Sequence, residues 1–393
     1  MADVQTMSPG LTPAATDQLN IDTTRSVLMM LGVLLHAADI HTVSGLWLVA
    51  DADRHGGFDA LVALIHSFRV PGFFLLSGLL LAGSLQRHSL VVLARRQVLR
   101  LGLPLLSCWL LLNHLQQWLL GGPLLDWAPL YQLWFLRDLL LLNLMLMAWL
   151  AWRRRAGPAG HQAQAHRHAA ALGPQRLLSA WAQQAWLSHW LVICGAGALG
   201  AYALLMALRL SRLAYLDLPG DLTPFGMALY APLFIAGLWL QRQPALLRAW
   251  LACPWWMLLP ATALAYQGEL LSRDALSVVE RELALLLELL GIWCATGAAV
   301  GWLSRRRASH RPWLQLLARC SYTVFLLHHL VVVSLGLLLL PLPWPALLKF
   351  SLNASLSLLL CCALHLWVVE RWRLALLLFN GRRRPPEARA RAA

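Results

Sequence analysis

The segment Leu283–Leu303, with the sequence LALLLELLGIWCATGAAVGWL, contains a single ionisable side chain and is followed closely by the basic run Arg305–Arg307. A helix needs about 20 predominantly apolar residues to cross the hydrocarbon core of a bilayer. This segment is therefore long enough and apolar enough to span a membrane. The arginines that follow it are typical of the cytoplasmic end of such a span.

The composition of the whole chain agrees with this interpretation. Of the 393 residues, 59% are hydrophobic and 13% are charged, and the mean hydropathy is positive. Soluble domains contain about 25% charged residues, so a soluble domain, a disordered chain, a collagen and a coiled coil are excluded. The sequence also lacks the alternating segments of about ten residues that mark outer-membrane barrels. It predicts an all-α polytopic membrane protein.

Working outward from Leu283–Leu303, we expect about ten transmembrane helices. The leucine-rich segments are separated by short polar loops. Segments 224–241 and 250–267 are the weakest members because prolines interrupt them. The ten expected spans cover residues 26–49, 58–82, 98–120, 132–152, 186–208, 224–241, 250–267, 283–303, 314–339 and 345–369.

The distribution of charge predicts the orientation of these spans. The chain has 32 basic and 18 acidic residues, a net charge of +14 and a single lysine, Lys349. Most arginines fall in the loops on the N-terminal side of the membrane, and cytoplasmic loops are the ones that retain basic residues. We therefore expect both termini in the cytoplasm and no nucleic-acid partner. The arginine-rich, lysine-poor usage is typical of a GC-rich bacterium, so we expect the inner (cytoplasmic) membrane.

The chain divides into a short N-terminal segment, a membrane domain and a basic tail. We expect residues 1–21 to be disordered in the cytoplasm, residues 22–379 to form the membrane domain, and residues 380–393 to form a cytoplasmic tail. Within the domain, residues 153–185 are rich in Ala, Gly, Gln and His and are expected to form a flexible cytoplasmic loop. The seven cysteines lie in or beside apolar spans without metal-ligand spacing. We expect them to be small core residues and predict no metal site.

The first span contains the strongest set of ionisable residues. Arg25 and His36 are eleven residues apart, which places them on one helix face, roughly 16 Å from each other. Asp39 follows His36 by three residues and is placed to hold its ring. Ionisable groups inside a span indicate function by default, and histidine is the natural base near neutral pH. The alternative is a packed histidine that hydrogen-bonds to another helix.

The second span adds His66 and Arg69, followed by Pro71-Gly72. Arg69 lies well inside the span and needs a partner or a water-filled cavity; the structural alternative is an interhelical salt bridge. We expect Pro71-Gly72 to break the helix and expose carbonyl groups inside the protein. Ser77-Gly78 favours close packing against another helix.

Further polar residues lie near the ends of other spans. Arg95, Arg96 and Arg100 precede the third span, where guanidinium groups suit the phosphates of a cytoplasmic cosubstrate or, alternatively, lipid headgroups. Trp134 and Arg137 open the fourth span and suit a platform for a sugar. The alternative is an aromatic belt with an arginine paired to a neighbour.

The ninth and last spans complete the set of candidates. His328 is expected a few residues into the membrane from the inner side, where a hydrogen-bonded interhelical role is the alternative. Tyr322 lies nearby, and Glu370 ends the last span. The candidate substrate-binding residues are His66, Trp134, Arg137, Tyr322, His328 and Glu370.

Together these residues resemble the acyltransferase 3 family of integral membrane O-acyltransferases. The resemblance rests on Arg25 with His36, on FRVPGFFLLSG at residues 68–78, on the arginine cluster before Pro104 and on the YxxFLxH pattern at residues 322–328. The motifs extend over nearly the whole chain and keep their order. In combination they are specific, although each alone is short.

Other details resemble one branch of that family, which modifies periplasmic glucans and includes the glucan succinyltransferases. They are the FRxPxFFLLSG form, LWFL at residues 133–136 and LFNG at residues 378–381. Glu370-Arg371 weakly resembles the end motif of the family. One departure concerns the pair of arginines, three residues apart, that often precedes the third span: here position 97 is Gln, so the assignment among the arginines of this cluster stays open.

The resemblance implies transfer of an acyl group from a cytoplasmic acyl-CoA, with acetyl-CoA and succinyl-CoA as candidates, to a hydroxyl of an extracytoplasmic glucan or other carbohydrate. It implies that His36 is catalytic and Arg25 is its essential partner, with the arginine cluster near the CoA phosphates. From its position, Arg69 is a candidate to stabilise an oxyanion or to bind an acyl carboxylate. The catalytic candidates are His36, Arg25, Asp39 and Arg69, and the donor-binding candidates are Arg95, Arg96 and Arg100.

Two other function classes fit the same residues. A proton- or solute-coupled transporter would use His36, Asp39 and Arg69 as its path, and a structural role in an envelope assembly is the third hypothesis. The expected partners are membrane lipids, a carbohydrate acceptor and proteins of envelope glucan synthesis. Consumption of a CoA thioester distinguishes the enzyme from the other two classes, and solute flux into sealed vesicles identifies the transporter.

Overall fold

The computed structural model describes residues 20–45, 47–124, 126–156, 186–216, 222–306 and 312–382. These residues form helices joined by loops, without a β-strand element in the described ranges. Among them, eight helices are long and apolar enough to cross a membrane. The predicted class, an all-α polytopic membrane protein, is therefore confirmed.

The candidate spans follow one another along the chain, and some contain π-helical or 3-10 segments. They are α2 (Ile21–Asp39), α3 (Gly56–Leu85), a composite helix Leu90–Leu119, η3 (Tyr131–Leu133) with α7 (Trp134–Ala156), α10 (Trp186–Leu210), α14 (Val278–Ser304), α15 (Pro312–Leu339), and α16 (Ala346–Leu364) with η6 (His365–Val369). The composite helix consists of α4 (Leu90–Gln97), the π-helical η1 (Val98–Gly102), α5 (Leu103–Cys108), the π-helical η2 (Trp109–Asn113) and α6 (His114–Leu119).

The remaining helices are shorter. They are η4 (Leu213–Tyr215), α11 (Pro224–Leu240), α12 (Pro244–Leu251), η5 (Trp255–Met257), α13 (Leu258–Asp274) and α17 (Arg373–Asn380). Two of the ten expected spans, α11 and α13, are helices of 17 residues. The expected span 250–267 is wrong in its boundaries, because the chain breaks near Pro254 and α13 runs on to Asp274.

The first expected span, residues 26–49, is also wrong in its boundaries. Helix α2 begins earlier because the Asn20 side chain accepts a hydrogen bond from the backbone N–H of Thr23 at 3.1 Å, which caps the helix. It ends at Asp39, where the Thr42 hydroxyl donates to the Asp39 carbonyl oxygen at 2.9 Å. As a result, His36 lies in the last turn of α2.

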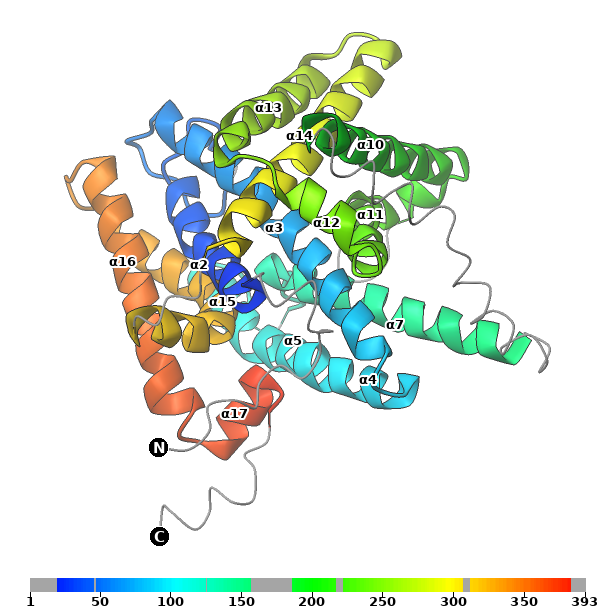
Figure 1. Ribbon diagram of the computed structural model, residues 1–393. Coiled ribbons are helices and arrows are strands. Elements are labelled where there is room, and N and C mark those ends of the chain that lie inside the picture. The colour runs from blue at the N-terminus through cyan, green and yellow to red at the C-terminus, as the bar shows by residue number, and fades with distance from the viewer. Residues whose placement is uncertain are drawn as a thin grey trace.

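Helix α3 runs through the middle of the bundle and contacts α2, α11, α13 and α14 (Figure 1). It continues unbroken through Pro71, so the expected helix break at Pro71-Gly72 is wrong. Leu28 and Val300, from the flanking helices, pack against Gly72 and enclose this part of α3. Pro71 thus lies inside a helix whose neighbours bury it on both sides, the setting in which membrane helices tolerate proline.

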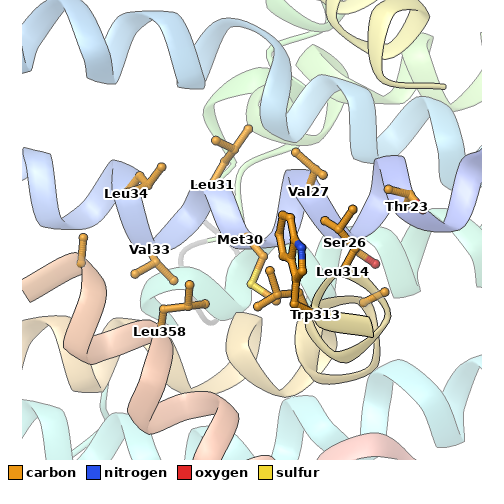
Figure 2. Close-up of a pocket in the computed structure, with 13 residues that line it drawn as sticks. Thr23, Ser26, Val27, Met30, Leu31, Val33, Leu34, Trp313, Leu314 and Leu358 are labelled. Carbon is orange, nitrogen blue, oxygen red and sulfur yellow. The ribbon is translucent and has the colours of Figure 1, made fainter. Parts of the chain in front are cut away.

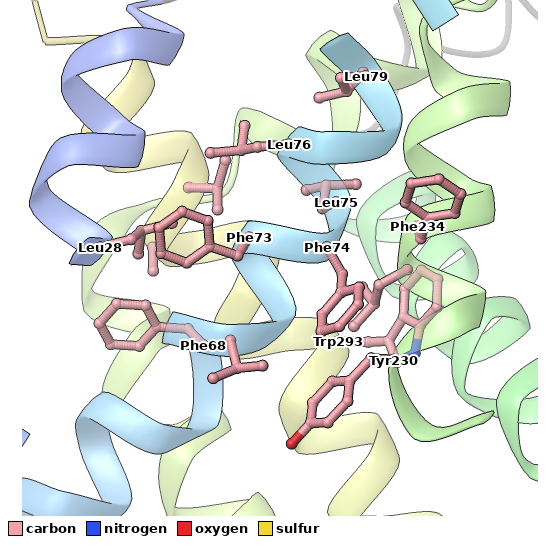
Figure 3. Close-up of a cluster of buried hydrophobic side chains, with 14 of the residues drawn as sticks. Leu28, Phe68, Phe73, Phe74, Leu75, Leu76, Leu79, Tyr230, Phe234 and Trp293 are labelled. Carbon is pink, nitrogen blue, oxygen red and sulfur yellow. The ribbon is translucent and has the colours of Figure 1, made fainter. Parts of the chain in front are cut away.

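Aromatic side chains fix α3 against α11 and α14. Phe74 stacks on Tyr230 with ring centroids 5.1 Å apart, and Figure 3 shows both rings next to Trp293. A Cβ atom on Gly78 would lie 2.1 Å from the carbonyl oxygen of Phe234. The close packing predicted for Ser77-Gly78 is therefore confirmed for Gly78. The seven cysteines are free, and all except the half-buried Cys362 are buried, as expected for core residues.

The described residues touch the predicted domain borders at a few places. Helix α7 continues through Ala156, so the expected loop 153–185 begins later than predicted, and its residues 157–185 lie outside the described residues. Residues 1–19 of the N-terminal segment and 383–393 of the tail also lie outside them. The described start of the tail is Asn380, which ends α17.

Lys349, the single lysine of the chain, anchors the loop after α2, residues 40–55. Lys349 of α16 donates a hydrogen bond to Oδ2 of Asp51 at 2.8 Å, and their side chains are 5% and 4% exposed. His41 lies 3.6 Å from the same carboxylate, and Asp53 accepts from the backbone N–H of Ala346 at 2.7 Å. Burial opposes the charged form of Asp51, but these partners hold its pKa below the ordinary value.

We expect Lys349→Met to lower the free energy of unfolding by about 2 kcal/mol, because it leaves Asp51 buried without its cation. Thermal unfolding in detergent measures this loss, and adding Asp51→Asn should restore part of it. The stabilisation is present above the ordinary carboxyl pKa and is lost as the pH falls through the lowered pKa of Asp51. Unchanged stability of the single variant would contradict this role.

Candidate functional site

His36 is enclosed by aromatic rings at the C-terminal end of α2. Its Nδ1 lies 3.0 Å from Oδ2 of Asp39, which confirms that Asp39 holds the ring. The indole of Trp47, from the loop after α2, stacks on His36 with ring centroids 5.5 Å apart. The rings of His328 and His329 on α15 lie at 5.4 and 4.8 Å. The His36 side chain is 15% exposed, so this cover leaves it little contact with solvent.

The contact with Asp39 determines which nitrogen of His36 is available for chemistry. A carboxylate only accepts hydrogen bonds, so we assign the proton of the neutral ring to Nδ1. Nε2 then carries the free lone pair and can take a proton from a substrate. The carboxylate would stabilise the imidazolium that forms. The contact with Asp39 therefore leaves Nε2 as the ring nitrogen that can act as a base.

Arg69 and His328 approach α2 one turn before His36. A Cβ atom on Gly32 would lie 3.1 Å from Nη2 of Arg69 and 3.0 Å from Nε2 of His328, so both polar groups press against this glycine. Gly32 precedes His36 by four residues and shares its helix face. His328 Nδ1 donates to the carbonyl oxygen of Phe325 at 2.7 Å, which leaves its Nε2 as a buried acceptor.

Arg69 is a buried cation without an ion-pair partner among the described residues, although the charge of Asp39 acts on it. The residue is 6% exposed, and its Nε makes no hydrogen bond. Among the carboxylates that the structure describes, none forms an ion pair with Arg69, so the alternative of an interhelical salt bridge finds no support within the described residues. A buried guanidinium in this state is costly. Its position next to His36 suits an anion that forms or binds there.

A second layer of polar residues supports this cluster from α6 and η3. The side-chain oxygen of Gln116 accepts a hydrogen bond from Nδ1 of His329 at 2.9 Å, and Tyr131 stacks on the same ring with centroids 5.6 Å apart. Tyr131 has a φ of 44°, which is rare for a residue with a bulky side chain. Such strained residues gather at functional sites.

Sequence analysis did not find Trp47, His329, Gln116, Tyr131 or Gly32. The adjacent histidines in one span were the available signal for His329. His328 was expected close to the inner end of its span, which is wrong: α15 begins at Pro312, so this residue lies in the second half of the helix.

The other predicted substrate-binding residues lie apart from one another. His66 is exposed on α3, within electrostatic range of Asp39 and Arg69. Trp134 stacks on Tyr230 in the core rather than beside His36. Arg137 donates to Asp138 at 2.8 Å, which is the neighbour pairing that we gave as its alternative.

Glu370 belongs to an ion-pair group beyond the end of η6. Its carboxylate accepts hydrogen bonds from Arg319, and it also lies 3.0 Å from Nε2 of His365. Thr323 contacts the other ring nitrogen of His365 at 2.7 Å. These residues join α15 to the end of the last span, so Glu370 is placed as a structural partner in this group.

Arg25, predicted as the catalytic partner of His36, and the arginines predicted to bind the donor lie toward the opposite end of α2 from His36. Arg25 lies near the start of α2, 3.8 Å from Asp22. Arg100 lies in the π-helical segment η1, and its carbonyl oxygen accepts a hydrogen bond from the Tyr322 hydroxyl at 2.7 Å. Arg95 and Arg96 are exposed on α4. Arg25 and His36 therefore mark the two ends of one helix.

An apolar cavity of about 340 Å³ lies beside α2, between this helix, α15 and α16. Figure 2 shows Val33 and Met30 of α2 pointing toward Leu358 and Trp313, which also line the cavity. Neither Arg25 nor His36 lines the cavity. It is therefore separate from the histidine cluster. Within the described ranges, no group of three His, Cys, Asp or Glu residues is arranged to hold a metal ion.

One comparison with known proteins identifies the family. A family profile described as "Acyltransferase domain" matches residues 18–366. The chain belongs to this acyltransferase family. No curated protein and no solved structure matched the chain. The matched region of the acyltransferase contains both ends of α2 and the whole histidine cluster, and it stops before α17.

In this acyltransferase, Asp39→Asn should lower kcat about 10- to 100-fold, because the neutral amide orients the His36 ring without stabilising its charged form. Steady-state kinetics should show KM nearly unchanged. Asp39→Glu should recover part of the rate because it restores the carboxylate. Complete loss of activity in folded Asp39→Asn would contradict an orienting role.

Proposed function

We propose that the protein is an integral membrane O-acyltransferase. It moves an acetyl or succinyl group from a cytoplasmic acyl-CoA to a hydroxyl of an extracytoplasmic glucan or other carbohydrate, in the inner membrane of a bacterium. The observation that carries this proposal is the arrangement around His36. A histidine held by Asp39, with the buried cation of Arg69 one turn away and in no ion pair within the described residues, supplies a base and a site for developing negative charge.

The chemistry needs both of these groups. A sugar hydroxyl is a weak nucleophile, so Nε2 of His36 takes its proton as the oxygen attacks the thioester carbonyl. The carbonyl oxygen becomes negative, and the guanidinium of Arg69 stabilises it. The C–S bond then breaks, and the imidazolium returns the proton to the leaving thiolate. The products are an ester and free CoA.

In this proposal each end of α2 binds a different substrate, the donor at one end and the acceptor at the other. Arg25 and His36 lie on one face of this helix, roughly 16 Å apart. In the proposal, the nucleotide end of the donor stays at the Arg25 end and its thioester reaches His36 along the interior of the bundle. The acceptor arrives from the end of α2 where Trp47 covers His36. Such cover excludes water and protects the thioester from hydrolysis.

The proposed acceptor class has support from rings near His36. Trp47 and Tyr131 are aromatic side chains next to the histidine cluster, and both are half-buried. Aromatic rings with polar edges suit the apolar faces of sugars. The similarity of the FRxPxFFLLSG, LWFL and LFNG segments to the glucan-modifying branch favours the same class.

The test uses purified protein in nanodiscs with acetyl-CoA or succinyl-CoA and a mixed glucan acceptor. We expect release of the CoA thiol together with an acceptor that gains one acyl mass. The donor that reacts identifies the acyl group. If folded protein releases no thiol with either donor while acceptor is present, the proposed function is wrong for these substrates, and solute flux into vesicles becomes the next measurement.

A further inference from the structure

The last described helix, α17, packs onto the composite helix near Arg100. Ser107 donates a hydrogen bond to the carbonyl oxygen of Leu378 at 2.6 Å, and Thr323 donates to the side-chain oxygen of Asn380 at 3.1 Å. Gly381 ends the helix with a φ of +60°. A Cβ atom there would lie 2.8 Å from the Cα atom of Arg100, so the chain passes directly against η1.

This packing places Arg382 beside the arginines at the start of α2. The charges of Arg25, Arg96 and Arg382 all act on Arg100, and Arg25 also acts on Arg382. Burial and the neighbouring charge of Arg25 lower the pKa of Arg382. Cationic groups from α2, from the composite helix and from the end of α17 therefore meet at one place.

Counted over the described residues, the cluster contains more positive than negative charge. Asp22 lies 3.8 Å from Arg25 and is the carboxylate that also acts on Arg382. Like charges that are brought together repel each other, so the protein gains if an anion with several charges enters the cluster. Guanidinium groups bind phosphate oxygens with paired hydrogen bonds. The cluster thus suits a ligand that carries more than one phosphate.

The backbone at Arg100 is also unusual. Arg100 lies in a π-helical segment, and the Tyr322 hydroxyl occupies its carbonyl oxygen. Single π-helical turns inside α-helices are frequent at functional sites. In this chain the wider turn coincides with the contact between Gly381 and Arg100. The same few residues therefore determine both the backbone conformation at η1 and the positive charge of the cluster.

We propose that Arg382 binds the phosphate groups of the donor's nucleotide end together with Arg25 and Arg100. This inference rests on the proposed function, because it takes acyl-CoA as the donor. It adds a residue that lies beyond the matched region 18–366 and that sequence analysis did not single out. It also makes α17 part of the donor site, because the contact between the end of α17 and η1 sets the position of Arg382.

The test measures binding of CoA separately from catalysis. Isothermal titration with CoA is carried out on wild type, Arg382→Gln and Arg373→Gln in nanodiscs of phosphatidylcholine. Arg373 is the matched control, because it is exposed at the other end of the same helix. We expect Arg382→Gln to raise Kd about tenfold, Arg382→Lys to raise it less, and Arg373→Gln to leave it unchanged.

Two further measurements distinguish the nucleotide phosphates of CoA from lipid headgroups as the ligand of Arg382. In the transfer assay, Arg382→Gln should raise KM for acyl-CoA but not for an acyl-pantetheine, which lacks the nucleotide phosphates. An equal rise for both donors would overturn the inference. So would an effect of Arg382→Gln that is seen only in nanodiscs with anionic lipid, because the arginine would then bind headgroups.

Failure of this inference can be distinguished from failure of the proposed function. CoA binding that weakens in Arg382→Gln without any acyl transfer supports the inference and contradicts the function. Acyl transfer with an unchanged Kd in Arg382→Gln supports the function and overturns the inference. Absence of CoA binding to folded wild type overturns the inference outright.

Discussion

Replacing His36 with alanine is expected to lower kcat of acyl transfer about 10³-fold, while the protein still inserts and folds. The variant loses the base that takes the acceptor proton, and general-base catalysis contributes about 10²- to 10⁴-fold. The measurement is release of the CoA thiol and the mass of the acceptor, with wild type assayed in parallel. Normal acylation by His36→Ala would exclude His36 from the mechanism.

The chain offers a matched control for this variant. His55 lies 3.0 Å from the carboxylate of Asp53, the same distance that separates His36 from Asp39, but its side chain is 63% exposed. His55→Ala should keep full activity because that pair is far more open to solvent and belongs to the loop after α2. An equal loss in both variants would indicate damage to the fold rather than loss of a base.

Replacing Arg69 with glutamine is expected to lower kcat about 10²- to 10³-fold, the usual cost of removing a donor to an oxyanion. The thermal stability of the same variant should stay unchanged or rise. Arg69 is buried without a carboxylate partner in the described chain, so its removal relieves a desolvated charge and breaks no ion pair. Arg69→Lys should retain part of the activity because it keeps the charge.

Arg137 is the control for stability. It forms an ion pair with Asp138, whose side chain is 3% exposed, so Arg137→Gln should destabilise the protein by leaving that carboxylate buried without its cation. If Arg69→Gln destabilises the protein as strongly and keeps its kcat, Arg69 is structural. A loss confined to the succinyl donor would instead assign Arg69 to the carboxylate of the acyl group.

Local contacts of the site were predictable from the sequence, whereas contacts across helices were not. The distance between Asp39 and His36 follows from a spacing of three residues on one helix, and the structure confirms it at 3.0 Å. Tyr131 and His329 meet through the packing of different helices, which no local pattern encodes. Trp47 reaches His36 because the chain turns back after Asp39, where the Thr42 hydroxyl donates to the Asp39 carbonyl oxygen.

The same contrast between local features and contacts of distant residues applies to the fold. Hydropathy predicts the class because each span must be apolar along its own length. It does not reveal that Lys349 pairs with Asp51, since those residues lie at distant places in the chain. It also missed the continuity of α3 through Pro71, because the tolerance of that proline depends on what the neighbouring helices supply.

The glycine contact between α3 and α11 fixes the position of the helix that carries Arg69. A Cβ atom on Gly237 would lie 2.2 Å from the carbonyl oxygen of Leu75, just as one on Gly78 would collide with Phe234. Interlocked backbones at this spacing have no room to slide, so the two helices move as one rigid body. Arg69 lies on one of these two helices, α3. On its other face α3 meets α2 through side chains, Leu28 against Gly72 and Arg69 against Gly32, so any adjustment around Arg69 is expected at that contact.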